Sequence, residues 1–141
     1  MAGLKNLIRL HEWTVDERRR ELGMFLRRRE ELDRRLEDLE AELKREQALA
    51  GSNPGGVGVT FGAYYNMVRI RRHRLEQQIR AAEADILEAR DILSRAYMEL
   101  KKYQVAQDVR TKKEELEAAR EEQRGLDELA LQLYRRKAQK R

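Results

Sequence analysis

The chain has 141 residues, of which 40% are charged and only 6% aromatic, and its formal net charge is +5. This composition is too polar for a compact globule of this size, and its richness in Ala, Glu, Lys, Leu and Arg is typical of long helices and coiled coils. The absence of cysteine excludes disulfides, thiolate zinc sites and a cysteine nucleophile. No apolar run approaches the roughly 20 residues of a membrane span, and the stretch from Leu4 to Leu10 is too short for a secretory signal. The sequence therefore predicts a soluble, intracellular protein.

The first predicted helix runs from about residue 3 to 50 and follows a heptad pattern. Ten of its fourteen seam positions are apolar, which indicates a helix that buries one stripe against a partner. The a positions are Ile8, Val15, Leu22, Arg29, Leu36, Leu43 and Ala50, and the d positions are Leu4, His11, Arg18, Phe25, Leu32, Leu39 and Glu46.

The predicted turn spans residues 51 to 60 and contains the only proline of the chain, Pro54. Gly51 suits a left-handed helix C-cap, because glycine adopts that conformation without steric cost. Thr60 suits the N-cap of the next helix, because its hydroxyl can accept a hydrogen bond from a free backbone N–H. One helix is therefore expected to stop here and another to start.

The second predicted helix runs from about 61 to 141 and has a heptad register of its own. Its a positions are Tyr65, Arg72, Ile79, Ile86, Leu93, Leu100 and Gln107, and its d positions are Phe61, Val68, Leu75, Ala82, Ala89, Ala96 and Tyr103. In an antiparallel pair the numbers of facing residues add to a constant. With a sum of 111, the a positions of each helix face d positions of the other; for example, Phe25 faces Ile86. The predicted fold is all-α, an antiparallel coiled-coil hairpin in a single domain, 1–141.

The second helix is longer than the first and leaves a tail, residues 109 to 141, without a partner in the hairpin. Continuing the hairpin seam into the tail gives few apolar residues, whereas a register shifted by two residues gives more. Because two residues correspond to about 200° of rotation, this stripe lies on another side of the helix. We call it the tail stripe; it consists of Val109, Lys112, Leu116, Ala119, Gln123, Leu126, Ala130, Leu133 and Lys137. The pattern predicts a binding surface.

The sequence contains no catalytic constellation. His11 and His73 fall on different arms and have no histidine or cysteine at helical ligand spacing; His11 is a seam position expected to face Leu100. The glycine-rich turn lacks the lysine of a phosphate-binding loop. We therefore expect no enzyme activity, no metal and no cofactor.

Two basic clusters carry much of the positive charge, one at Arg69, Arg71, Arg72 and Arg74 and the other from Arg135 to Arg141. Clustered basic side chains can neutralise nucleic-acid phosphates. However, acidic residues are interleaved over most of the chain, and no aromatic residues punctuate the basic runs for base stacking. The pattern favours a solvated or acid-binding face over a nucleic-acid site.

Several short motifs, in order around the turn, resemble the FliJ family of flagellar type III export proteins, over essentially the whole chain. They are Leu7 to Trp13 with Val15 to Leu22, Tyr64 with Met67, Val68 and Leu75, Lys101 to Gln104, Leu126 to Ala130, and Tyr134 to Arg136. The sequence departs from the family pattern at Arg71, where an apolar residue is usual, and at Gly125, because glycine in a helix interior costs about 1 kcal/mol.

The resemblance implies a non-catalytic, cytoplasmic stalk that is peripheral to the inner membrane through its partners. Those partners would be the export ATPase hexamer, the cytoplasmic domain of the export-gate membrane protein, and substrate chaperones. The implied ring-binding residues are Leu7, Leu126, Asp127, Glu128, Ala130, Leu133, Tyr134 and Arg135, and the implied gate-binding residues are Tyr64, Met67 and Arg71.

Two other interpretations remain open from the sequence. A stalk protein of a virulence-type secretion ATPase would have the same architecture, and gene neighbourhood would separate it from a flagellar one. A generic coiled-coil scaffold, self-associating through the tail, would differ from both by not binding an ATPase ring.

Overall fold

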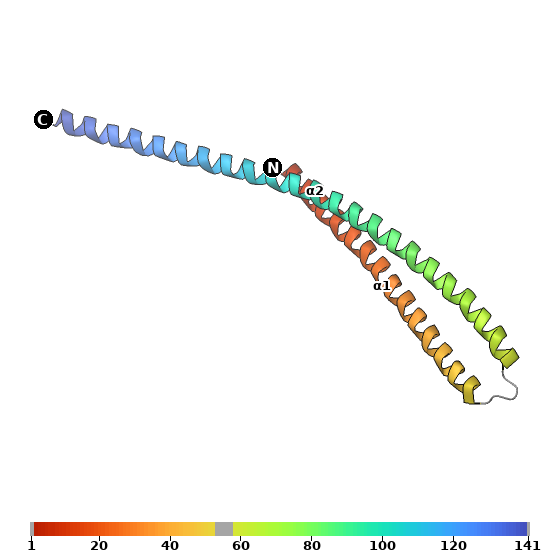
Figure 1. The fold of residues 1–141 in the computed structure, drawn as a ribbon. Coiled ribbons are helices and arrows are strands. Elements are labelled where there is room, and N and C mark those ends of the chain that lie inside the picture. The colour runs from red at the N-terminus through yellow and green to blue at the C-terminus, as the bar shows by residue number, and fades with distance from the viewer. Residues whose placement is uncertain (1, 53–57, 141) are drawn as a thin grey trace. The chain divides into compact units, whose positions relative to one another are not determined.

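The computed structural model describes residues 2–52 and 58–140 and contains two helices (Figure 1). Helix α1 runs from Ala2 to Ser52 and helix α2 from Gly58 to Gln139. No strand occurs within the described residues. The predicted all-α class with two long helices is confirmed.

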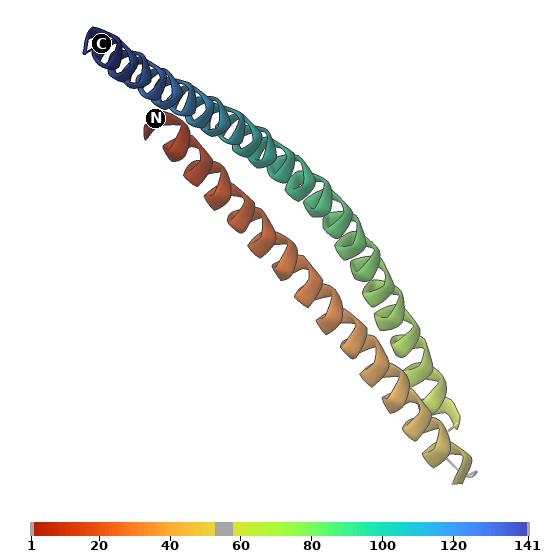
Figure 2. The ribbon, with the colours of Figure 1, turned by 90° about the vertical axis from the view of Figure 1, so that its left-hand side faces the viewer.

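The chain divides into two compact units, of which Glu12–Tyr97 is the helical hairpin. Figures 1 and 2 show its two arms, the orange part of α1 and the green part of α2, running side by side. The buried residues of this unit are all apolar and all at predicted seam positions. They are Val15, Leu32, Leu39, Val68, Ala82, Ile86 and Ala89.

Among the described residues, two ion pairs connect the arms of the hairpin and show how the arms are aligned. The Arg29 guanidinium lies 2.9 Å from the Glu83 carboxylate, and that of Arg72 lies 2.8 Å from the Glu40 carboxylate. The residue numbers of each pair add to 112, within one residue of the predicted pairing. Because these side chains are nearly half exposed, the pairs contribute little stability, and the apolar seam holds the arms together.

The seam departs from its predicted register close to the turn. Among the predicted seam positions, only Glu46, Tyr65 and Arg72 are exposed, and Tyr64 is half-buried in place of Tyr65. One residue of helix corresponds to 100° of rotation, so a local change of phase suffices to exchange the two tyrosines. Arg72 leaves the seam because its guanidinium reaches Glu40 and also Glu76, 3.4 Å away.

The predicted caps of the turn are both wrong. Gly51 lies inside α1 and no described glycine has a positive φ, so it is not a left-handed C-cap. Thr60 lies inside α2, which begins at Gly58, so it is not the N-cap. A single exposed glycine costs a helix only about 1 kcal/mol, too little to stop α1 ahead of Pro54. The centre of the predicted turn, 53–57, lies outside the described residues.

The second unit combines Met1–His11 with Met98–Arg141. Ile8 and Leu100 are buried in it, and the His11 ring stacks on the Tyr103 ring with centroids 4.7 Å apart. His11 thus contacts the residue one turn beyond the predicted Leu100. Farther along α2, every residue from 111 to 140 is exposed.

Candidate partner-binding surfaces

Apart from Leu10, the exposed large apolar residues of the second unit all lie on α2. Two seam residues of this unit, Leu100 and Tyr103, are buried or half-buried, and the exposed apolar residues begin at Met98 and Val105. They continue through the tail stripe and its neighbours: Val109, Leu116, Leu126, Leu129, Leu131, Leu133 and Tyr134. The predicted stripe is therefore present but starts earlier than its predicted first residue, Val109.

The stripe lies on the side of α2 opposite to its seam in this unit. Met98 precedes the seam residue Leu100 by two positions, and Val105 follows the seam residue Tyr103 by two, which is about 200° around the helix in each case. A partner can therefore contact the stripe while the seam stays packed. Sequence periodicity could have found Met98 and Val105, because the steps from Met98 to Val105, Val109 and Leu116 are helical repeats of seven and four.

The residues that the resemblance assigns to the ATPase ring are exposed on the last turns of α2, with the exception of Leu7. Leu126, Ala130 and Leu133 follow one another on the stripe, and each is exposed. Glu128 and Arg135 are seven residues apart and fall on the far side of the helix from the stripe, while Asp127 and Tyr134 border it. The α2 residues of the predicted set thus extend from the apolar stripe around one side of the helix to its far side.

Leu7 is half-buried and lies apart from the other predicted ring residues. Its neighbours Leu4 and Lys5 border a small groove whose α2 lining extends from Gln107 to Glu114. Leu126 lies twelve residues beyond Glu114, about 18 Å along the helix axis at 1.5 Å per residue. The structure therefore does not bring Leu7 together with Leu126–Arg135.

The three residues assigned to the export gate share one side of α2 in the hairpin unit. Tyr64 is half-buried, Met67 is 49% exposed and Arg71 is exposed. The Tyr64 hydroxyl is shielded from solvent and has no hydrogen-bonding partner among the described residues. Its pKa is raised, chiefly by burial and then by the neighbouring Glu42 carboxylate. Tyr64 therefore has a structural role at the seam, whereas Met67 and Arg71 are available to a partner.

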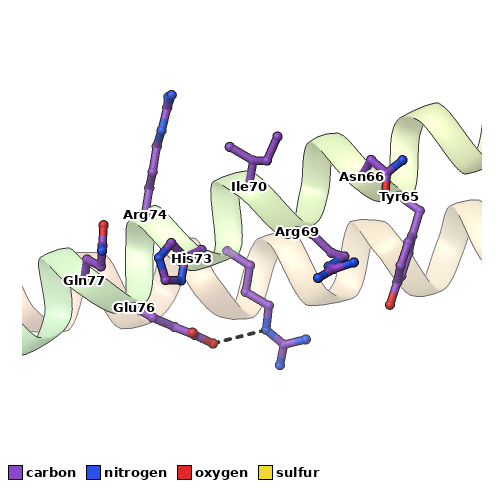
Figure 3. Close-up of a pocket in the computed structure, with 9 residues that line it drawn as sticks. Tyr65, Asn66, Arg69, Ile70, His73, Arg74, Glu76 and Gln77 are labelled. Atoms are coloured by element: carbon purple, nitrogen blue, oxygen red, sulfur yellow. Dashed lines mark ion pairs between the residues drawn. The ribbon is translucent and has the colours of Figure 1, made fainter.

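Three arginines of the first basic cluster, Arg69, Arg72 and Arg74, line an open groove along α2 (Figure 3). Ile70 and Arg74 point away from α1 in this view, and Tyr65, exposed by the local change of phase, lines the same groove. Arg72 is engaged by Glu40 and Glu76, whereas Arg69 and Arg74 form no ion pair with any residue of the described chain. One arginine of the cluster is thus neutralised within the hairpin, and at least two remain for an acidic partner.

The described residues form no group of three or more histidine, aspartate or glutamate side chains that could hold a metal ion. His11 stacks on Tyr103, and His73 lines the basic groove of the other unit. Neither helix, within its described part, has a stretch both long and apolar enough to cross a membrane.

Comparison with known proteins gives one result. The family model described as flagellar FliJ protein matches residues 1–139. No curated protein and no solved structure matches the chain. The match covers both helices, including the hairpin seam and the exposed tail, and it agrees with the resemblance drawn from the short motifs. The chain therefore belongs to the flagellar FliJ family and is a coiled-coil protein related to flagellar export.

Proposed function

We propose that this protein is a non-catalytic stalk and adaptor of the flagellar type III export apparatus. In this role it stays in the cytoplasm, binds the export ATPase hexamer, and links that ring to the export-gate membrane protein and to substrate chaperones. The observation that carries the proposal is the uncovered apolar stripe on the tail of α2, together with membership of the family.

The tail suits insertion into a ring of subunits. All residues from 111 to 140 are exposed, so partners can surround the helix on every side. The stripe offers apolar contact area, and basic residues near the C-terminal end, such as Arg135, Arg136 and Lys137, can approach acidic side chains of a ring opening.

The hairpin suits a second, separate contact. Met67 and Arg71 lie on one side of α2, many helical turns before the tail. A gate or chaperone contact there would leave the tail free for the ATPase, which is what an adaptor requires. The family match names a flagellar protein, and this supports a flagellar over a virulence-type apparatus.

The proposed ring contact is tested by removing the end of the tail. Deletion of 126–141 should abolish binding to the purified ATPase hexamer in a pull-down, while the melting temperature of the hairpin stays unchanged, because no hairpin residue is removed. The point variants Leu126→Ser with Leu133→Ser should weaken binding, since both are stripe residues.

Leu131→Ser is the matched control for these variants. Leu131 is as exposed as Leu133, 57% against 54%, but it lies off the stripe, so the change should alter binding less. A truncated protein that binds the ring as well as the full chain does would contradict the proposed contact.

A further inference from the structure

The tail stripe has the spacing of one half of a coiled coil, and nothing in its unit covers it. Leu116, Leu126 and Leu133 are 52%, 56% and 54% exposed. The part of α1 in this unit ends at His11 and packs on α2 as far as the seam residues near Gln107. Apolar residues repeating at a and d positions are normally buried by another helix with the same repeat.

We propose that a second copy of this chain covers the tail stripe, in an antiparallel helix pair over residues 112 to 137. In this pairing the numbers of facing residues add to 249, so the twofold axis passes between Arg124 and Gly125. Leu116 then faces Leu133 of the other copy, and Ala119 faces Ala130. The leucine layers supply the apolar contact, and the alanine layers let the two helices approach closely.

Charge complementarity selects this partner and this register. The positions that flank an antiparallel seam meet their counterparts across the interface. In the proposed pair Glu115 meets Arg136, and Arg120 meets Asp127, each contact occurring twice by symmetry. The remaining flanking contacts are Glu122 with Leu129 and Lys113 with Tyr134, so no flanking contact joins like charges.

The neighbouring arrangements bring like charges together. An antiparallel pair in which the numbers add to 242 places Arg120 against Arg120 and Glu122 against Glu122 at the twofold axis. A parallel pair in register places Glu122 beside Asp127. In the proposed register the only like charges are Lys112 and Lys137, at the ends of the pair, where long side chains extend into water.

The pairing does not depend on the proposed function, but it would regulate it. The same stripe cannot contact an ATPase ring and a second copy at once. Self-association would therefore keep the tail covered until the ring is present, and excess ring would convert the dimer into the ring complex.

Single cysteines test the pairing in the full-length chain, which has no cysteine of its own. Equal amounts of the Leu116→Cys and Leu133→Cys proteins, mixed and oxidised, should give a disulfide-linked dimer that contains one copy of each. Each protein alone should give no such dimer, because Leu116 of one copy lies 17 residues from Leu116 of the other, about 25 Å along the axis. Circular dichroism should show an unchanged helix content, since both positions are exposed.

The Ala118→Cys and Leu131→Cys proteins are the matched control. Their numbers also add to 249, so the two cysteines would lie at one level along the helix pair, but on the outer sides of the two helices. The proposal is overturned if the Leu116→Cys and Leu133→Cys proteins give no more disulfide-linked dimer than this control pair. Efficient linking of either protein with itself also overturns it, because that result indicates a parallel pair.

A charge exchange gives an independent readout by sedimentation velocity. Arg120→Asp alone and Asp127→Arg alone should each weaken the dimer by about tenfold, since two attractive contacts become repulsive. The double variant should restore the dimer, because its contacts are again of opposite charge. A chain that remains monomeric at all concentrations, or a double variant no better than the single ones, would refute the pairing.

Discussion

At the scale of single residues, size and shape at the seam decide how the hairpin packs. Ala82 and Ala89 are 1% and 6% exposed, although alanine buries little area. Their contribution comes from their small size, because a small side chain lets the opposite helix approach closely. Large residues fill the same layers from α1, as Leu22 is predicted to do at Ala89.

Ala89→Leu should therefore destabilise the hairpin by about 1–3 kcal/mol through overpacking of a filled layer. Thermal unfolding followed by circular dichroism measures the change. Ala84→Leu is the control, because Ala84 is exposed and a helix accepts leucine as readily as alanine there. Equal melting temperatures for the two variants would contradict the predicted layer.

Tyr64 gives the hairpin a dependence on alkaline pH. Its pKa is raised above 10.0 in the folded chain, so the folded state resists deprotonation more than the unfolded state. The stability of the hairpin is therefore fully retained below pH 10 and falls as the pH rises through the raised pKa. Tyr64→Phe should reduce this loss and leave the chain at least as stable at neutral pH, because it removes a shielded hydroxyl without a hydrogen-bonding partner. Denaturant unfolding at several pH values, from neutral to above 10, measures both effects; identical alkaline profiles would contradict the assignment.

At the scale of the element, the two parts of α2 differ in what holds them. In the hairpin unit the helix buries Val68, Ala82 and Ile86, whereas all residues from 111 to 140 are exposed. Isolated helices gain little stability without tertiary contacts. The tail therefore depends on local interactions, such as the hydrogen bond of 3.1 Å from the Gln123 amide to the Asp127 carboxylate.

In a sample diluted until the chain is monomeric, amide hydrogen exchange should be fast over 111–140 and slow over the hairpin seam, because local opening costs less where no contacts are buried. Higher protein concentration or added ATPase ring should slow exchange in the tail. A monomeric tail protected as strongly as the hairpin would contradict this difference.

At the scale of the whole molecule, the intramolecular pairing of α1 with α2 is the central feature. Phe25 and Ile86 are predicted to face each other, and Ile86 is 3% exposed in the hairpin. Cysteines at both positions should form a disulfide within one chain on oxidation, seen as faster migration on a non-reducing gel. Cysteines at Leu26 and Leu87, which are 39% and 67% exposed, serve as the control. Links that form only between chains would show that the hairpin is intermolecular.

The seam could be derived from the sequence alone. All nine buried residues of the described chain occupy predicted a or d positions, and the ion pairs that connect the arms lie within one residue of the predicted register. Heptad periodicity is a geometric consequence of 3.6 residues per turn, so it records which face is buried without knowledge of the partner. The tail stripe could be read for the same reason.

Tertiary structure alone decided the details where periodicity is weak. Tyr64 and Tyr65 are adjacent residues of the same type, and only the position of the opposite arm determines that Tyr64 is half-buried and Tyr65 exposed. Gly51 and Thr60 fit caps by residue type, yet both are helical, because a helix continues while the backbone allows it. Met98 and Val105 belong to the exposed surface because α1 contacts the other side of α2 at that level. For the two tyrosines, and for Met98 and Val105, the sequence offered side chains for two sides of a helix, and the position of the neighbouring helix chose between them.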